Sequence, residues 1–200
     1  MKKHLLCTAL VTLISFVFNT AHAQETPAQA TITAVTGSST VKLPDGSSVP
    51  ATVGLKVSQG AVISTEKNTQ VSLLVHEGIV AVLASATEVE IEKISVNANG
   101  TRNAMLHLKT GNLASSLDPA RKSVNNYGVR TAKGVAMARG TDLTVTVNGN
   151  VSLVAVLNGN VQVTWAGGQS VSITGNTATA VTTNNTGVQT TGTLGAAMQA

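Results

Sequence analysis

Short runs of β-favouring residues recur along most of this chain. Runs of five to nine residues rich in Val, Ile, Leu and Thr are separated by Gly, Asn and Asp at intervals of about ten residues. Pairs such as Asp45-Gly46 and Asn99-Gly100 are typical of tight turns. No stretch of three helical turns has an amphipathic pattern. The sequence therefore predicts a series of short strands joined by turns.

The carboxyl half of the sequence also indicates how its strands are arranged. Residues 151–157, VSLVAVL, have apolar side chains on both faces, which predicts a central strand that is covered on both sides. The runs that end at Trp165 and Ile173 alternate again and predict further antiparallel strands. We therefore predict an all-β fold, either a two-sheet sandwich or a short β-solenoid-like stack of consecutive antiparallel strands.

The amino terminus has the layout of a bacterial signal peptide. A basic start, an apolar run over residues 5–18 and the small-residue site Ala21-His22-Ala23 predict residues 1–23 as the signal peptide, with cleavage after Ala23. The apolar run is shorter than the roughly 20 residues that a spanning helix needs. The expected location is the periplasm or the exterior, with no transmembrane segment after processing.

The remaining chain is long enough for one domain. We expect a flexible segment over residues 24–30, one β domain over residues 31–175, and an uncharged Thr/Asn/Gly-rich edge strand or tail over residues 176–200. An edge with neither a charged residue nor a proline can template pairing with another chain. A homo-oligomer formed through this last part is therefore one alternative.

Composition excludes several kinds of chemistry. Cys7 is the only cysteine and lies inside the apolar run of the signal peptide, so the exported chain has no disulfide, thiolate nucleophile or cysteine metal site. Aromatic residues make up 2% of the chain, which argues for a core of small aliphatic side chains and against a deep aromatic pocket.

Charge is unevenly distributed along the chain. Residues 24–92 contain three lysines against seven carboxylates, residues 93–139 contain eight basic residues against one carboxylate, and no charged residue follows Asp142. If the basic residues share a face, they could bind an anionic partner. The candidate patch consists of Arg121, Lys122, Arg130, Lys133 and Arg139. Alternatively, Glu88, Glu90 and Glu92, which fall on one face of a strand, neutralise basic side chains on a neighbouring strand.

The most distinctive stretch spans residues 129–147, VRTAKGVAMARGTDLTVTV. Gly134 and Gly140 predict bends, because glycine reaches a positive φ without strain. Thr141 restarts the alternation of a strand after the second bend, and Arg139 is held at a fixed place before it. We interpret Gly134, Arg139, Gly140 and Thr141 as a structural motif, with Arg139 satisfied by carbonyls or by a carboxylate such as Asp142.

Catalytic and cofactor motifs are absent from the sequence. No nucleophile elbow, phosphate loop, dinucleotide fingerprint or calcium loop is present, so no cofactor, metal or catalytic residue is predicted, and no nucleic-acid partner. His76 and His107 follow the predicted signal peptide in separate segments, and we expect both at the surface or in turns.

Five segments in order resemble the FecR domain, the periplasmic domain of the iron-dicitrate signalling regulators and of many exported proteins. They are residues 55–75, the pair Glu77-Gly78, and residues 106–113, 129–145 and 154–163. The most specific is VRTAKGVAMARGTDLTV, which is similar to the V-x-T-x-x-[AG]-x-A-x-[VA]-R-G-T block of that family. The resemblance covers residues 31–175 and implies a non-enzymatic all-β domain for signalling or scaffolding in the envelope. Only four residues precede the apolar run, so direct control of a sigma factor is not expected.

The sequence thus gives two hypotheses from different classes. The first is a non-enzymatic exported interaction module of the FecR type that binds an envelope protein or an anionic polymer. The alternative is a structural or adhesive subunit that self-assembles through its polar carboxyl-terminal strands.

Overall fold

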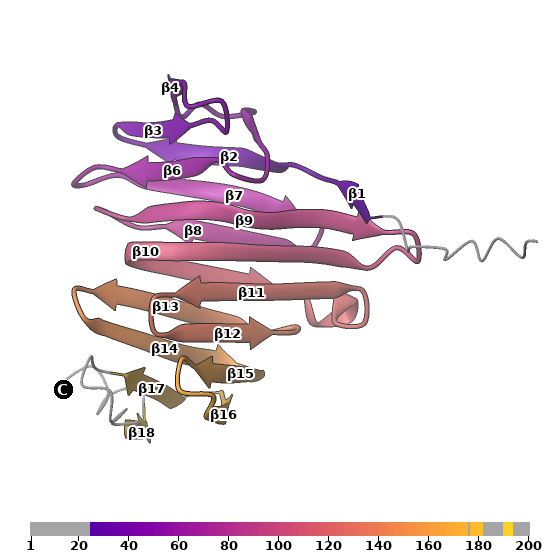
Figure 1. The fold of residues 1–200 in the computed structure, drawn as a ribbon, viewed down its shortest axis with the longest axis vertical. Coiled ribbons are helices and arrows are strands. Elements are labelled where there is room, and N and C mark those ends of the chain that lie inside the picture. Colours follow the sequence, from indigo (N-terminus) through magenta and orange to yellow (C-terminus); the bar gives the residue numbers. More distant parts are fainter. Residues whose placement is uncertain (1–24, 176, 182–189, 194–200) are drawn as a thin grey trace, which may run out of the picture.

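Two β-sheets pack face to face in the computed structural model, which describes residues 25–175, 177–181 and 190–193 (Figure 1). In spatial order, sheet A contains β4 (Ser48–Pro50), β3 (Ser39–Lys42), β6 (Val62–Thr65), β9 (Glu88–Asn97), β10 (Arg102–Leu117), β11 (Asn125–Thr131), β12 (Gly134–Ala138), β15 (Asn160–Trp165) and β16 (Ser170–Thr174), with β1 (Glu25–Pro27) also beside β9. Sheet B contains β5 (Lys56–Val57), β2 (Ala30–Thr36), β7 (Gln70–His76), β8 (Ile79–Leu83), β10 again, β13 (Asp142–Asn148), β14 (Val151–Asn158), β17 (Thr177–Val181) and β18 (Thr190–Thr193). The prediction of an all-β fold, either a two-sheet sandwich or a β-solenoid-like stack, is confirmed for the fold class.

The chain visits the two sheets in alternation. The hairpin β11–β12 lies in sheet A, β13–β14 in sheet B, β15–β16 in sheet A and β17–β18 in sheet B. Each hairpin pairs with the previous hairpin of its own sheet, as β12 does with β15 and β14 with β17. The molecule therefore grows by one layer with each hairpin, and Figure 1 shows the layers stacked from the amino end to the carboxyl end.

The strand β10 belongs to both sheets. Its first part pairs with β9 and β11 in sheet A, and its second part, from Gly111 onward, pairs with β8 and β13 in sheet B. The chain then returns through a short 3-10 helix, η1 (Pro119–Arg121), and enters β11 parallel to the first part of β10. The prediction of consecutive antiparallel strands is therefore wrong at β10 and β11, because the crossing of β10 makes the chain return to its starting end.

At three places where the chain passes between the sheets, a buried threonine packs in space against a glycine from another part of the chain. Thr69, Thr87 and Thr141 are buried, and each hydroxyl donates toward the carbonyl two residues earlier, at 3.4, 3.2 and 3.1 Å. Each side chain also fills the space beside a glycine of the adjacent corner, since a Cβ built on Gly37, Gly111 or Gly159 would lie 2.6, 2.3 or 2.8 Å from the respective threonine oxygen. These glycines have positive φ angles of 79°, 91° and 85°. We call these contacts the threonine–glycine corners.

The interior between the sheets is aliphatic. Ile91 and Leu106 of sheet A and Leu73 and Leu113 of sheet B are fully buried in one continuous cluster. The largest fully buried side chain is Tyr127, whose hydroxyl lies 2.6 Å from the Ser115 hydroxyl. Burial raises the pKa of Tyr127, so the phenol is neutral and the pair is an uncharged hydrogen bond that links the two sheets.

Two predictions about the termini are affected by the structure. The segment expected to be flexible includes β1, which pairs with β9 and is attached by an ion pair of 2.8 Å between Glu25 and Lys93. The carboxyl-terminal segment was expected to be an edge strand or a tail. Its strand β17 instead lies inside sheet B, between β14 and β18. The predicted signal peptide lies outside the described residues, and the division of the chain at residues 23, 30 and 175 stays a prediction.

The strand β14 is central in sheet B, as predicted, but it is covered on one face only. Ser152, Val154 and Val156 are buried in the interior. On the other face the small Ala155 is buried, but Val151 and Leu157 at the two ends are 38% and 52% exposed. No second layer covers this face among the described residues, so the expectation of cover on both sides is wrong.

We expect Gly111→Ala to destabilise the protein far more than Gly46→Ala. Both glycines have a φ near 90°, which costs alanine about 1–2 kcal/mol. A Cβ at Gly46 meets open space, whereas a Cβ at Gly111 would lie 2.6 Å from the Thr87 Cα and 2.7 Å from the Ala86 carbonyl, which adds about 1–3 kcal/mol. Urea denaturation measures both variants, and equal losses would contradict the proposed role of the corner.

Candidate functional site

Three of the four predicted motif residues have a structural role. A Cβ on Gly134 would lie 2.5 Å from the carbonyl of Thr164, so glycine permits the close approach of β12 and β15. Gly140 has a φ of 61°, and a Cβ there would lie 2.8 Å from the Cα of Pro119. Thr141 is 1% exposed, and its hydroxyl lies 3.1 Å from the Arg139 carbonyl and 3.2 Å from the Asn160 carbonyl.

Arg139 differs from these three residues. Its side chain is exposed, and no carboxylate of the described residues forms an ion pair with it. The expected partner Asp142 instead accepts hydrogen bonds from Ser116 at 2.6 Å and from Asn158 at 3.0 Å. These two bonds, Ser116 first, lower the pKa of Asp142, which is therefore ionised and already satisfied. Of the partners predicted for Arg139, carbonyls or a carboxylate such as Asp142, the Asp142 carboxylate is therefore not the partner.

A shallow open groove on the outer face of sheet A lies beside Arg139. Its lining comes from β12, β15 and β16 and the residue that follows β12: Met137, Ala138, Arg139, Asn160, Gln162 and Ser172. Ser172 donates a hydrogen bond of 2.6 Å to Asn160 Oδ1, which leaves the Asn160 amide nitrogen to face solvent. This groove has no signal in the sequence, because strand alternation shows that Asn160 and Gln162 face outward but not which strands they adjoin.

The five residues of the predicted basic patch do not form one surface. Arg121 pairs with Glu77 and, at 3.6 Å, with Asp118, while Arg130 pairs with Glu92 at 2.6 Å. Lys133 lies in the turn before β12 and Arg139 follows its other end, about 20 Å away along the strand.

Lys122 and Arg139 are the two patch residues that the fold brings to one corner. The Cβ of Lys122 lies 3.3 Å from the position of a Cβ on Gly140, the residue after Arg139. Both side chains are exposed, and neither forms an ion pair with the described residues. We call this pair the cationic corner.

The three glutamates of β9 neutralise basic side chains on neighbouring strands, as the alternative reading proposed. Lys109 of β10 lies 3.5 Å from Glu88 and 3.2 Å from Glu90, and Arg130 of β11 pairs with Glu92. The bond to Glu90 is the main cause of the raised pKa of Lys109. Much of the positive charge of residues 93–139 is therefore balanced within sheet A.

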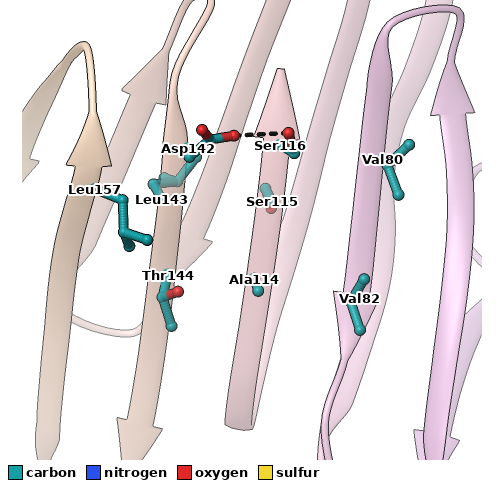
Figure 2. Close-up of a pocket in the computed structure, with 9 residues that line it drawn as sticks. All are labelled: Val80, Val82, Ala114, Ser115, Ser116, Asp142, Leu143, Thr144 and Leu157. Atoms are coloured by element: carbon teal, nitrogen blue, oxygen red, sulfur yellow. Dashed lines mark hydrogen bonds between the residues drawn. The ribbon is translucent and has the colours of Figure 1, made fainter. Parts of the chain in front are cut away.

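The outer face of sheet B has a different character. Figure 2 shows a shallow depression in which Val80 and Val82 lie on one side, Thr144 and Leu157 on the other, and Ala114 between them. Asp142 is the one charged residue in its lining, and the dashed line in Figure 2 marks its bond from Ser116. This face is apolar and almost uncharged, in contrast to the ion pairs of sheet A.

The two histidines lie on different strands, His76 in β7 and His107 in β10. His76 was expected at the surface, but it is 8% exposed, because a register shift between Leu74 and His76 turns its side chain inward. Its Nε2 lies 3.3 Å from the carbonyl of Asn103. Within residues 25–175 and the two described strands that follow, no group of three His, Cys, Asp or Glu side chains could hold a metal ion. In the same residues, no helix is long and apolar enough to cross a membrane.

A family model described as FecR protein matches residues 61–162, which is more than half of the chain. The chain belongs to the FecR family. The match includes the Gly134 to Thr141 motif and most of the strands that build the threonine–glycine corners. No curated protein matches the sequence.

Two solved structures have a similar fold. Both are crystal structures, at 1.65 and 2.50 Å resolution, of a candidate anti-sigma factor from Parabacteroides distasonis. Each has a TM-score of 0.55 and a sequence identity of 16% to this FecR protein. The similarity covers 66% of this chain and 59% of that chain, so the common part is a portion of each protein.

We expect Thr141→Val to destabilise the protein by about 1–3 kcal/mol. Valine keeps the shape of the side chain but loses the hydroxyl that reaches the Arg139 and Asn160 carbonyls. The matched control is Thr144→Val on the outer face of β13, the strand that follows Thr141, where we expect a change within about 0.5 kcal/mol. Urea denaturation compares the two variants, and a neutral Thr141→Val would show that the hydroxyl does not stabilise the corner.

His76 makes the stability depend on pH. Burial lowers its pKa below the usual 6.5, so the unfolded chain takes up a proton before the folded one does. The stabilising contribution of neutral, buried His76 to the free energy of unfolding is therefore fully present above about pH 6.5. It decreases as the pH falls below this value. We expect His76→Gln to flatten this slope between about pH 7 and pH 5, as measured by urea denaturation. An unchanged slope would show that other groups cause it.

Proposed function

We propose that this FecR protein is a non-enzymatic interaction module of the bacterial envelope that acts in signalling or as a scaffold. The module is exported, with the signal peptide cleaved after Ala23 and the folded part in the periplasm or outside the cell. It binds a protein or an anionic envelope component and needs no cofactor. Membership of the FecR family supports the regulatory role, and the fold common to a candidate anti-sigma factor is consistent with it.

The observation that carries the binding proposal is the cationic corner. Most basic side chains of residues 93–139 are committed to carboxylates, whereas Lys122 and Arg139 lie together and exposed without one among the described residues. Two adjacent uncompensated cations attract an anionic surface and orient it during approach. The partner therefore carries negative charge where it meets this corner.

A second candidate function is a subunit that self-assembles through its carboxyl-terminal strands. The two ends of the stack differ in the residues that discourage pairing with another strand, and this difference favours self-assembly through the carboxyl end. At the amino end, the edge strand β4 ends in Pro50 and β5 begins with Lys56, and both residues discourage further pairing. At the carboxyl end, the sequences of β16, β17 and β18 contain neither a charge nor a proline.

We expect the double variant Lys122→Gln/Arg139→Gln to lose a partner that the unmodified chain captures from an envelope extract at low salt. The control, Arg121→Gln/Arg130→Gln, removes the same net charge from residues that are already paired, so it should retain capture. Affinity purification followed by mass spectrometry measures both, and high salt should release the partner from the unmodified chain.

The outcomes separate the two functions. Capture that survives in the first double variant would remove the cationic corner from the proposal. If nothing but the chain itself is recovered, light scattering should decide whether salt-insensitive multimers form. If the unmodified chain forms such multimers and a chain truncated after Val181 does not, the result would favour self-assembly. If the unmodified chain is a monomer, the result would count against it.

A further inference from the structure

The groove beside Arg139 has an excess of hydrogen-bond donors. The Arg139 guanidinium donates only, and Asn160 has its oxygen occupied by Ser172, so its amide nitrogen is left to donate. The Gln162 side chain also lines the groove and makes no hydrogen bond with the described residues, and its amide nitrogen is a further donor. These three side chains come from adjoining positions of β12 and β15, since Ala138 pairs with Val161 and Met137 with Gln162.

No carboxylate of the described residues is paired with these donors, and the acceptors in the lining are the neutral oxygens of Gln162 and Ser172. The groove lining contains no acidic residue. The nearest carboxylates in the sequence are committed elsewhere: Asp142 to Ser116 and Asn158, and Asp118 to the Ala120 amide and Arg121. Lys122, whose Cβ lies 3.3 Å from the position of a Cβ on Gly140, brings a second positive charge to the same corner. These exposed donors face water in the free molecule, so an anionic acceptor from another molecule can take the place of that water.

The chemistry of the lining favours a carboxylate on an extended peptide. A guanidinium beside primary amides matches a planar carboxylate, which accepts two hydrogen bonds in one plane. The groove is shallow and open along the face of a sheet, and it lies beside Met137, which is 39% exposed. Such a surface suits an extended chain that places one acidic side chain on the donors and an apolar one on the methionine.

We propose that this groove binds an Asp or Glu side chain from an extended segment of a protein partner, with Arg139 as the principal contact. We name the part of the groove formed by Met137, Arg139, Asn160 and Gln162 the carboxylate groove. The inference rests on the proposed function, because it assigns the site and the chemical class of the partner that the interaction module binds. It also explains why Arg139 is exposed while Gly134, Gly140 and Thr141 are held by packing.

The test is a titration of the chain, without its predicted signal peptide, followed by nuclear magnetic resonance. The probe is a short capped peptide in which glutamate alternates with threonine, and the control probe has glutamine in place of glutamate. We expect the acidic peptide to shift the side-chain amide signals of Asn160 and Gln162 and the Arg139 Nε signal, and high salt to reverse the shifts. The glutamine peptide should leave them unchanged.

Variants separate a specific site from general attraction. Arg139→Gln should weaken binding of the acidic peptide about tenfold or more, whereas Lys133→Gln, which removes the same charge at the other end of β12, should change it less than about twofold. Asn160→Asp supplies an internal carboxylate beside Arg139 and should also abolish binding. It serves as the second variant if Arg139→Gln does not fold.

Three results would overturn the proposal: no shift of the groove signals by the acidic peptide, equal weakening by Arg139→Gln and Lys133→Gln, or tighter binding of inorganic phosphate or of a uronic-acid oligosaccharide at the same signals. Failure here is distinct from failure of the proposed function. A partner that is still captured by Arg139→Gln in the affinity purification would leave the interaction module intact and remove only the carboxylate groove.

Discussion

The contact between a buried threonine and a glycine of the adjacent layer is the constraint on which this FecR fold depends. Wherever the chain passes from one sheet to the other, a strand ladder is interrupted and backbone groups lose their partners. Thr87 repairs one such interruption, because its hydroxyl accepts from the Asn112 amide at 3.0 Å and lies 3.2 Å from the Asn112 carbonyl. Glycine at position 111 leaves the space that this side chain needs. The same arrangement at Thr141 and Gly159 keeps successive layers in register.

This constraint also positions the candidate site. Thr141 holds the Arg139 carbonyl and the Asn160 carbonyl at one corner, so the side chains of Arg139 and Asn160 leave the backbone from fixed points. The exposed arginine thus extends from a turn that is held by the buried Thr141 hydroxyl. A site on such a turn loses little conformational entropy when a partner binds, which favours specific recognition by few contacts.

Local pattern predicted the fold class but not the contacts between distant segments. Alternation and turn residues were enough to predict an all-β fold of two sheets and the bend at Gly140, because both depend on neighbouring residues. The pairing of Arg121 with Glu77 joins residues 44 positions apart and depends on the path of β10, which no local signal contains. For the same reason the sequence suggested a single basic patch, whereas in the structure Arg121 and Arg130 form ion pairs with carboxylates from distant segments. His76 was misplaced because a single register shift reverses the side of the sheet that a residue faces.

The double membership of β10 has a mechanical consequence. In a stack whose layers touch only their neighbours, the two ends can unfold separately, as repeat proteins do. Here one continuous strand pairs with β9 and β11 in sheet A and with β8 and β13 in sheet B, so the amino-terminal and carboxyl-terminal layers share the same piece of backbone. Neither half can separate from the other without breaking ladders in both sheets. A pull applied to one end of the molecule is therefore transmitted through this strand to the other end, and the domain resists force as a single unit.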